Sequence, residues 1–547
     1  MLRTSSKVLF ATATLLLICM ASSSQEGEEE ERCFTDGAFR AARAQDTCRS
    51  LVWRQAAWAE RVPPDQPYVW TADFHAAPMA CDAPLLEKLG AIVHGEVDFS
   101  NCGHYPSLCR KRLKVLGFDA WRGFGLDPCP HALRRKFFDA YKRDAEFWRV
   151  DLFVCHHPAA NCELLLPFNR SLLVHATTRL EFGRDDSLVD WRRPFMAGPG
   201  GSARAAERWA AWVKTLQAIA GDPRHTVAAN NLFDVRYIKY HTGIDAMYLP
   251  SWCEPPNTGG HDKPVTYEPL PGKEVLLVPY RDNLPKRNGW RHPVLEGLER
   301  AAKARASQFY FRRLQDAYAG GYSWADLAKH PALIFIPYQV STMFFFEAYR
   351  LSIPIFAPSL ALLSRWVREH GILWERIYGT PQRQRHASWA AEPDDPNSNE
   401  VGLEYWLGWS DIYHFDHVIL FDNWEHCLEL LGSTDFRAVS AAMKETNIKS
   451  REMLLRQWEG ILGRATRNNP AAMVPKIVGH DHGDTEYLTF GRLGARPWPL
   501  MDFDSQMRAL WPNLYTVPLA PDVAAQAETT CPSLSSFEVR SLFTWTC

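Results

Sequence analysis

The sequence predicts an α/β protein with two domains, each built on a parallel sheet with crossover helices. Three observations support this prediction. The chain has 547 residues, more than one hydrophobic core usually holds. Short apolar runs of strand length alternate with helical patterns on both sides of a Pro- and Gly-rich segment at 254–272. Hydrophobic residues make up 46% of the chain and aromatic residues 12%, with 21 Trp, which is typical of a well-filled globular protein.

The N-terminus has the pattern of a secretory signal. Arg3 and Lys7 precede an apolar run over 8–21, and three serines follow it. About 14 apolar residues are short for a membrane span of roughly 20. We therefore favour a cleaved signal over 1–24, with a single uncleaved membrane anchor as the alternative. Both place the protein in the lumen of the secretory pathway (Golgi or endoplasmic reticulum) or outside the cell. Residues 25–66 read as an acidic spacer and N-terminal extension.

Cysteine usage agrees with that compartment. The chain has 13 Cys, and Cys19 lies in the apolar run, which leaves twelve. Eight of these fall between Cys33 and Cys162, so we expect disulfides to make the N-terminal part disulfide-rich. No Cys-x-x-Cys pair supports a zinc site. Asn169 begins an Asn-Arg-Ser sequon for N-glycosylation.

A first domain is predicted over 67–253, and it opens with a strand–helix–strand unit. Its expected parts are a strand at 68–73, a loop at 74–78, a helix at 83–89 and a strand at 91–97. Gly90 ends the helix. Asp73 and His75 then follow the carboxyl end of the first strand. A His there is a candidate general base, oriented by a nearby carboxylate. The alternative is a loop His that only packs or forms a hydrogen bond.

Later strands of this domain also end in polar residues. His156 and His157 follow a strand at 150–155, but no third ligand is spaced to complete a metal site, so we predict none. Arg179 and Glu181 follow the strand at 172–176, and Asn231 follows the strand at 226–229. Arg179 suits an anionic or hydroxyl-rich group, and Glu181 is a second candidate base. We assign these three residues to the acceptor side.

A second domain is predicted over 273–430, after the linker at 254–272. Its first strand covers 274–279, and Arg281 and Lys286 follow it. These two side chains are either ordinary surface charges or basic groups with a binding role. The polar stretch 382–399 contains Asp394-Asp395, which we interpret as a solvated loop. Helices at 431–475 and a C-terminal extension at 476–547, with Cys531 and Cys547, complete the chain.

The stretch from Pro331 to Pro358 organises the second domain. The expected order is a strand at 332–337, a turn that begins at Tyr338, a short helix and a strand at 353–357. Ser341 or Thr342 caps the helix, at the sheet edge where ligands bind in open α/β folds. Free N–H groups and the helix dipole favour an anion there. Glu347 lies about one and a half turns further along, among aromatic residues, where ribose hydroxyls would compensate its burial; a satisfied core carboxylate is the alternative.

The pattern Ser341-Thr342-x-x-x-x-Glu347-Ala348, followed by Pro354 and Pro358, resembles the donor-binding half of GT-B nucleotide-sugar glycosyltransferases. The resemblance implies two Rossmann-like domains facing each other across a cleft. It implies that Glu347 binds the donor ribose and that the preceding turn faces the diphosphate, which Arg281 and Lys286 reach. Many retaining members carry a second acid where this chain has Gln339, so an inverting mechanism is favoured. Several inverting members have a base in the first loop of the N-terminal domain, the position of His75.

These observations predict a metal-independent glycosyltransferase that moves a hexosyl or pentosyl group from a nucleotide-sugar to a glycan or glycoprotein hydroxyl. The nucleotide-sugar is a co-substrate, and no cofactor is expected. A net charge of −2 gives no electrostatic case for nucleic acid. Two alternatives remain open. One is a retaining transferase on the same fold, and the other is a non-catalytic carbohydrate-binding protein, since abundant Trp suits sugar stacking equally well.

Overall fold

The computed structural model describes residues 66–100, 130–141, 147, 149–156, 159–177, 180, 201–253, 265–278, 293–373, 385–389, 395, 396, 398–468, 475–478 and 487–490. Among these, the residues within 67–138 and 151–470 belong to one compact unit, which holds both large sheets. The residues within 139–150 and 471–500 belong to a second unit. In the described part of the chain, no helix is long and apolar enough to cross a membrane.

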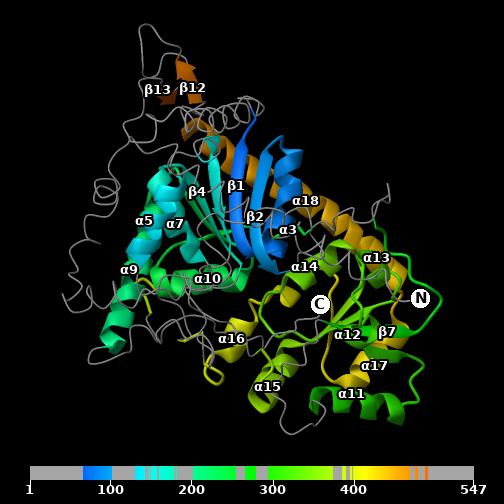
Figure 1. Cartoon of the computed structure of the whole chain (residues 1–547). Helices are drawn as coiled ribbons and strands as arrows, with labels where there is room; N and C mark the ends of the chain where they lie inside the picture. Colours follow the sequence, from blue (N-terminus) through cyan, green and yellow to red (C-terminus); the bar gives the residue numbers. More distant parts are fainter. Residues whose placement is uncertain are drawn as a thin grey trace, which may run out of the picture. The chain divides into compact units, whose positions relative to one another are not determined.

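The first large sheet is parallel and has six strands. They lie in the order β2 (Ile92–Ser100), β1 (Tyr68–His75), β3 (Leu152–Cys155), β4 (Ser171–Ala176), β5 (Thr226–Ala229) and β6 (Met247–Tyr248). Figure 1 labels β2, β1 and β4 among the arrows of this sheet, and β3 lies between β1 and β4. The order reverses between β1 and β3, because the chain crosses from one side of β1 to the other. Such a switch point is where open α/β sheets bind ligands.

The second large sheet is parallel and has five strands. They lie in the order β11 (Ile419–Phe421), β10 (Ile355–Pro358), β9 (Leu333–Phe335), β7 (Glu274–Val278) and β8 (Tyr310–Arg313). Within each sheet the first strand pairs with both the second and the third. The two sheets therefore share one strand order, and the prediction of two similar α/β halves is confirmed. The switch point of the second sheet lies between β7 and β9.

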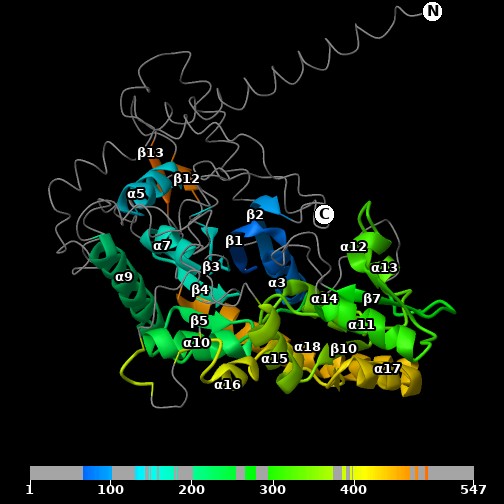
Figure 2. The ribbon, with the colours of Figure 1, turned by 90° about the horizontal axis from the view of Figure 1, so that it is seen from below.

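Helices connect the strands of both halves. In the first half they are α3 (Ala76–Lys88), α5 (Pro130–Tyr141), α7 (Cys162–Leu165), α9 (Gly201–Gly221) and α10 (Leu232–Thr242), with 3₁₀ turns η3 (Ala159–Asn161) and η4 (Leu166–Phe168). In the second half they are α11 (Pro293–Ala304), α12 (Leu314–Ala317), α13 (Trp324–Leu327), α14 (Met343–Arg350), α15 (Leu360–His370), α16 (Leu403–Leu407) and α17 (Trp424–Ser433), with the 3₁₀ turn η5 (Asp411–Tyr413). Figure 2 shows α10 beside β5, in agreement with their contact.

Both faces of the first sheet are buried, as parallel sheets require. Val69, Leu152 and Leu173 belong to a core with α3 and with the long helix α18 (Phe436–Asn468). On alternate positions Trp70 and Phe153 pack edge to face, with ring centroids 5.6 Å apart. Strands β3 and β4 are buried at every position, so their sequences show continuous apolar runs rather than alternation.

The core of the second sheet also receives residues from the first half. Phe233 and Tyr240 of α10 belong to it, and both pack edge to face against Trp406 of α16. Helix α18 contributes Met443 to this core and Trp458 to the core of the first sheet. Helix α18 therefore contributes to the cores of both halves, and it ends at Asn468, within the helical region predicted at 431–475.

Arg350, at the last position of α14, adds a polar link between separate segments. Its Nε donates to the carbonyl of Trp252 at 3.0 Å, and its Nη1 donates to Oδ1 of Asn447 at 2.6 Å. The guanidinium carbon lies 4.3 Å from the centroid of the Trp252 ring. Burial lowers the pKa of Arg350 to about 10, so the side chain stays charged at neutral pH. The end of α14 is therefore tied to the segment after β6 and to α18.

The predicted loop at 74–78 is wrong. Strand β1 continues through His75, and α3 begins at Ala76, so the chain passes from strand to helix without a loop. The register with β2 shifts between Asp73 and His75, and this irregularity supplies the change of direction that a loop would have provided. Gly90 follows the helix with φ +81°, as expected for a glycine stop.

The prediction of a disulfide-rich N-terminal part is not supported. Among the described cysteines one disulfide forms, between Cys81 and Cys253, 172 residues apart. Cys155, Cys162 and Cys427 are buried free thiols. Counting cysteines suggested pairing, but these three occupy core positions in which a thiol packs as a small apolar side chain. The remaining cysteines lie outside the described residues, as do the predicted signal at 1–24 and the acidic spacer before residue 66.

Candidate functional site

The strongest candidate site lies at the switch point of the second sheet, where the chain leaves β9. Thr342 caps α14 as predicted: its hydroxyl oxygen accepts a hydrogen bond from the backbone N–H of Phe345 at 3.3 Å. The helix begins at Met343 because Thr342 is in the extended region and its side chain replaces a missing backbone acceptor. The start of α14 therefore follows the carboxyl end of β9, which pairs directly with β7.

A small polar cavity lies at this corner. Its polar lining comes from Gln339, Ser341, Thr342, Ser410 and Asp411, and its apolar lining includes Phe335 and Phe345. Its volume of about 10 Å³ is room for a single water molecule. The hydroxyl oxygens of Ser341 and Ser410 are buried there, and neither has a hydrogen-bond partner among the described residues. Buried hydroxyls in a folded protein normally find partners, so two unused ones in one cavity indicate a site for a polar ligand.

Ser410 and Asp411 were missed by the sequence analysis. They lie between α16 and β11, some 70 residues after Ser341 in the chain. The backbone N–H of Asp411 donates to the carbonyl of Val340 at 3.3 Å, which holds this segment against the turn before α14. No spacing rule connects the two segments, since only the packing of the second half brings them together.

Of the other predicted donor residues, Glu347 and Tyr338 belong to the described part of the chain. Glu347 is in the middle of α14 and only 7% exposed, so the predicted burial is confirmed. Tyr338 is half-buried in the turn after β9. Arg281 and Lys286 lie outside the described residues, so their role stays a prediction.

The predicted catalytic pair lies at the switch point of the first sheet. Asp73 is fully buried near the end of β1, and its backbone pairs with Val97 of β2. His75 is the last residue of β1, and its backbone pairs with Ser100. Both residues therefore stand at the carboxyl edge, as predicted, but Asp73 has no exposed surface with which to meet a substrate. This placement favours a positioning role for Asp73 over direct catalysis.

The residues predicted for the acceptor side are only partly described. Arg179 and Glu181 lie outside the described residues. Asn231 is buried and caps α10: its Oδ1 accepts from the N–H of Asp234 at 2.7 Å. Its Nδ2 donates to Oδ1 of Asn230 at 2.7 Å and to Oδ2 of Asp234 at 2.8 Å. Because these bonds use both ends of the amide, Asn231 has a structural role in this conformation.

Asn169, the predicted glycosylation residue, stands at a sharp turn before β4. Its φ of 53° is in the left-handed region, which Asn tolerates better than most residues. Its Oδ1 accepts a hydrogen bond from Nη1 of Arg224 at 2.7 Å. Arg224 is itself held by the carboxylate of Asp222. The side chain is half-buried, and its glycosylation stays a prediction.

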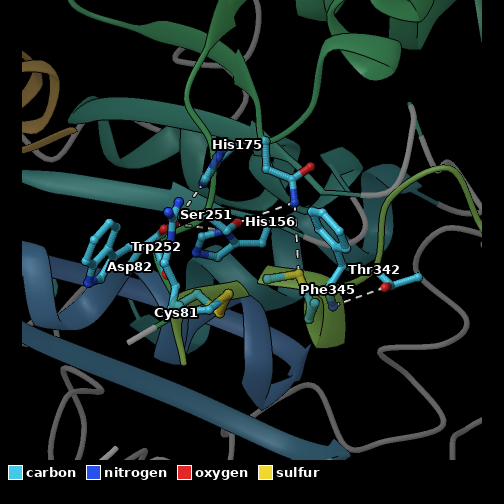
Figure 3. The surroundings of a disulfide bond; sticks show 12 residues. Cys81, Asp82, His156, His175, Ser251, Trp252, Thr342 and Phe345 are labelled. Carbon is cyan, nitrogen blue, oxygen red and sulfur yellow. Dashed lines mark hydrogen bonds and ion pairs between the residues drawn. A yellow bond between two sulfur atoms is a disulfide. The ribbon is translucent and has the colours of Figure 1, made fainter. Parts of the chain in front are cut away.

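A second polar cluster lies in the first half and joins Asp82, His156 and His175. Asp82 is on α3 beside the Cys81–Cys253 disulfide, His156 follows β3, and His175 is inside β4. Figure 3 shows the three side chains together near Cys81. Nδ1 of His175 lies 2.8 Å from Oδ2 of Asp82, and Nδ1 of His156 lies 3.8 Å from the same oxygen. Burial raises the pKa of Asp82, and the neighbouring His175 opposes that rise.

Of this cluster, only His156 follows a strand in a way that the sequence makes visible, and no metal site was predicted from it. Each ligand atom comes from a different element, and the three positions span more than 90 residues of the chain. The usual ligand spacings describe sites in which at least two ligands share a short segment. Sequence spacing therefore offers no ligands that would complete a site with His156, although the fold brings Asp82 and His175 next to it.

Comparison with solved structures finds distant similarity to glycosyltransferases. One is described as the glycotransferase of kitacinnamycin (11% identity, 73% of this chain and 100% of that chain covered, TM-score 0.38). The second is the glycosyltransferase SnogD from Streptomyces nogalater (12%, 72% and 99%, TM-score 0.36), and the third a glycosyltransferase from Rickettsia africae (10%, 74% and 100%, TM-score 0.38). No protein-family model matches the sequence, and no curated protein matches it. Likeness at this level assigns neither substrate nor mechanism to the chain.

Proposed function

We propose that this chain is a glycosyltransferase that binds a nucleotide-sugar at the corner formed by the turn after β9 and the start of α14. The observation that carries the proposal is the pair of buried, unused hydroxyls of Ser341 and Ser410 at that corner, next to free N–H groups of a helix. Helix N-termini bind phosphates because unpaired N–H groups and the helix dipole favour negative charge. Glu347 then accepts hydrogen bonds from the donor ribose. This assignment agrees with the resemblance of 341–358 to GT-B donor domains.

The cavity has room for one water molecule and none for a phosphate in this conformation. We therefore infer that donor binding widens the corner by moving the turn at 338–342 away from Ser410 and Asp411. This movement breaks the hydrogen bond of 3.3 Å between the backbone N–H of Asp411 and the carbonyl of Val340. One such bond contributes only about 1 kcal/mol, which the binding of a diphosphate readily offsets.

The proposed reaction is inverting transfer to an acceptor hydroxyl. His75 takes the hydroxyl proton, the acceptor oxygen attacks the anomeric carbon, and the bond to the diphosphate oxygen breaks. The N–H groups at the start of α14 stabilise the leaving diphosphate. We propose a glycan or glycoprotein acceptor in the secretory lumen. The apolar run at 8–21 and the Cys81–Cys253 disulfide, typical of oxidising compartments, support this location.

Ser341→Ala tests the donor site with an internal control. The Ser341 hydroxyl makes no hydrogen bond within the described structure, so its loss leaves stability unchanged within about 0.5 kcal/mol. If it binds a phosphate oxygen, donor affinity falls about tenfold. Ser364→Ala is the matched control, because that hydroxyl is also buried without a described partner but lies outside the cavity. Binding is measured by calorimetry with a panel of nucleotide-sugars. Equal affinities for the two variants would reject the donor site.

His75→Ala separates enzyme from binding protein. The variant should retain donor affinity and lose about 100-fold or more in kcat, because a general base contributes roughly that factor. His94→Ala, at a half-buried position on β2, is the comparison. Turnover is followed as release of nucleoside diphosphate. Donor binding without any turnover in the wild-type protein would instead indicate a non-catalytic carbohydrate-binding protein on this fold.

A further inference from the structure

The Asp82, His156 and His175 cluster presents three metal-ligating atoms to one buried point. The ligand atoms all lie within 4.8 Å of one another. The three residues are at most 2% exposed, and they come from α3, from the end of β3 and from β4. The cluster is separate from the proposed donor corner, which belongs to the second sheet, and the inference below does not depend on the proposed function.

Hydrogen bonding fixes the protonation of His175. Its Nε2 lies 2.7 Å from the carbonyl oxygen of Leu249, and a carbonyl can only accept, so Nε2 carries the proton. In the neutral ring Nδ1 then presents a lone pair to Oδ2 of Asp82 at 2.8 Å. A lone pair and a carboxylate repel at this distance unless a positive group lies between them. That group is either a proton or a metal ion.

A proton satisfies the Asp82–His175 pair but does not involve the other atoms of the cluster. Oδ1 of Asp82 is buried and has no hydrogen-bond partner among the described residues. Nδ1 of His156 faces Oδ2 from 3.8 Å, too far for a hydrogen bond. Two ligands of a tetrahedral ion with bonds of about 2.0–2.1 Å lie about 3.3 Å apart, between the two observed distances of 2.8 and 3.8 Å. A metal ion accounts for the nitrogen atoms and the carboxylate together.

The surroundings match those of known metal sites. A ligating His usually donates its other N–H to a carbonyl or carboxylate, which fixes its tautomer and orientation, and His175 makes that bond to Leu249. The Trp458 ring contacts the His175 ring edge to face, at 6.1 Å between centroids, and shields it from solvent. The adjacent disulfide joins Cys81 to Cys253, close in sequence to both Asp82 and Leu249.

We propose that Asp82, His156 and His175 bind one zinc ion. Two imidazoles and one carboxylate are ligands that zinc prefers, and Ca²⁺ and Mg²⁺ favour all-oxygen sites. The bound ion joins α3, β3 and β4 at the carboxyl end of the first sheet. The cluster supplies three of the four ligands of a tetrahedral ion, and we assign the fourth position to a water molecule. Because the three residues are at most 2% exposed, we give the ion a structural role outside the proposed transfer step.

The metal content of the full-length protein tests the site. Metal is first removed from the wild-type protein with a chelator, and ZnCl₂ is then added. The protein should bind about one zinc ion per chain, as measured by inductively coupled plasma mass spectrometry. The melting temperature should rise as zinc binds. With CoCl₂ in place of zinc, the protein should show the visible absorption of tetrahedral cobalt. No zinc uptake together with an unchanged melting temperature would overturn the proposal, and this result needs no variant.

Two variants locate the ion. His156→Gln removes one ligand and should weaken zinc binding by at least about 100-fold. His241→Gln is the control, since His241 is also a buried histidine, 4% exposed on α10, but lies outside the cluster. It should bind zinc as the wild type does. Circular dichroism confirms that both variants are folded. Unchanged zinc affinity in a folded His156→Gln protein would place the ion elsewhere and reject the site.

Discussion

The two halves of the molecule share one strand order but differ at the carboxyl ends of their strands. In the first half, Asp82, His156 and His175 gather ionisable groups of both signs and exclude solvent. In the second half, the same edge presents hydroxyls at the start of a helix, and two of them have no described partner. In our proposals the first arrangement holds a zinc ion between buried ligands, whereas the second leaves polar groups for a substrate that binds and dissociates. We infer that one fold supports a structural centre in one half and a substrate site in the other.

We expect the largest change in stability from removal of the disulfide beside Asp82. Cys81→Ser with Cys253→Ser opens a loop of 172 residues, and the free energy of unfolding should fall by about 2–5 kcal/mol. Cys427→Ala is the control for loss of a buried cysteine that forms no disulfide, with a cost of about 1 kcal/mol. Denaturant titration measures both. A cost for the double variant no larger than the control would show that the bond does not stabilise the first half.

Acid should lower the stability of the protein through protonation of His225, which lies in the first half. Burial lowers the pKa of His225 to about 4, and its Nδ1 accepts a hydrogen bond from the N–H of Leu172 on β4. Between the folded pKa and the usual 6.5, the unfolded chain binds a proton that the folded chain rejects. The free energy of unfolding therefore falls as the pH falls, by up to about 2 kcal/mol from pH 7 to pH 5.

His225→Gln should remove most of that slope. His426→Gln, at a side chain 37% exposed on α17, should keep it. The comparison is made by denaturant titration at pH 5, 6 and 7. This range lies above the pH at which Asp222 protonates, since the hydrogen bond from Arg224 lowers the pKa of that carboxyl. Identical slopes for the two variants would assign the acid sensitivity to other groups.

A smaller effect separates capping from binding in the second half. Thr342 and Ser359 cap α14 and α15, each through a side-chain oxygen that accepts from a backbone N–H. Thr342→Ala and Ser359→Ala should each cost about 1 kcal/mol of stability. Only Thr342→Ala should weaken nucleotide-sugar binding, because only Thr342 lines the polar cavity. An equal loss of affinity in both would mean that the effect passes through stability alone.

The fold could be predicted from the sequence because its strands are short apolar runs bounded by clear stop signals. The strand–turn–helix–strand unit of the second half was found within two residues at each end, including Thr342 as the cap. The predicted boundaries of strands and helices are wrong where the backbone changes direction without a loop. The junction of β1 and α3 is such a place, since Ala76–Pro78 carry no helix start signal and the register shift depends on pairing with β2.

The candidate sites could be predicted only where one segment supplies the residues. Ser341, Thr342 and Glu347 lie on one strand–helix unit, so their spacing was informative. Ser410 joins them through packing of a segment that no motif connects to α14. Asp82 and His175 could not be predicted for the same reason, because only packing brings their separate segments together. Asn231 is a different case, because the polar residue predicted for the acceptor side is a helix cap in the structure, and its acceptor role stays a prediction.

The most direct test of the central claim is hydrogen exchange with and without a saturating nucleotide-sugar, analysed by mass spectrometry of peptides. The account predicts protection of the backbone amides at 336–350, around the turn after β9 and the start of α14. The corresponding edge of the first half, at 156–177, should show little change from the nucleotide part of the donor. Protection confined to 156–177, with none at 336–350, would contradict the assignment of the donor to the second half.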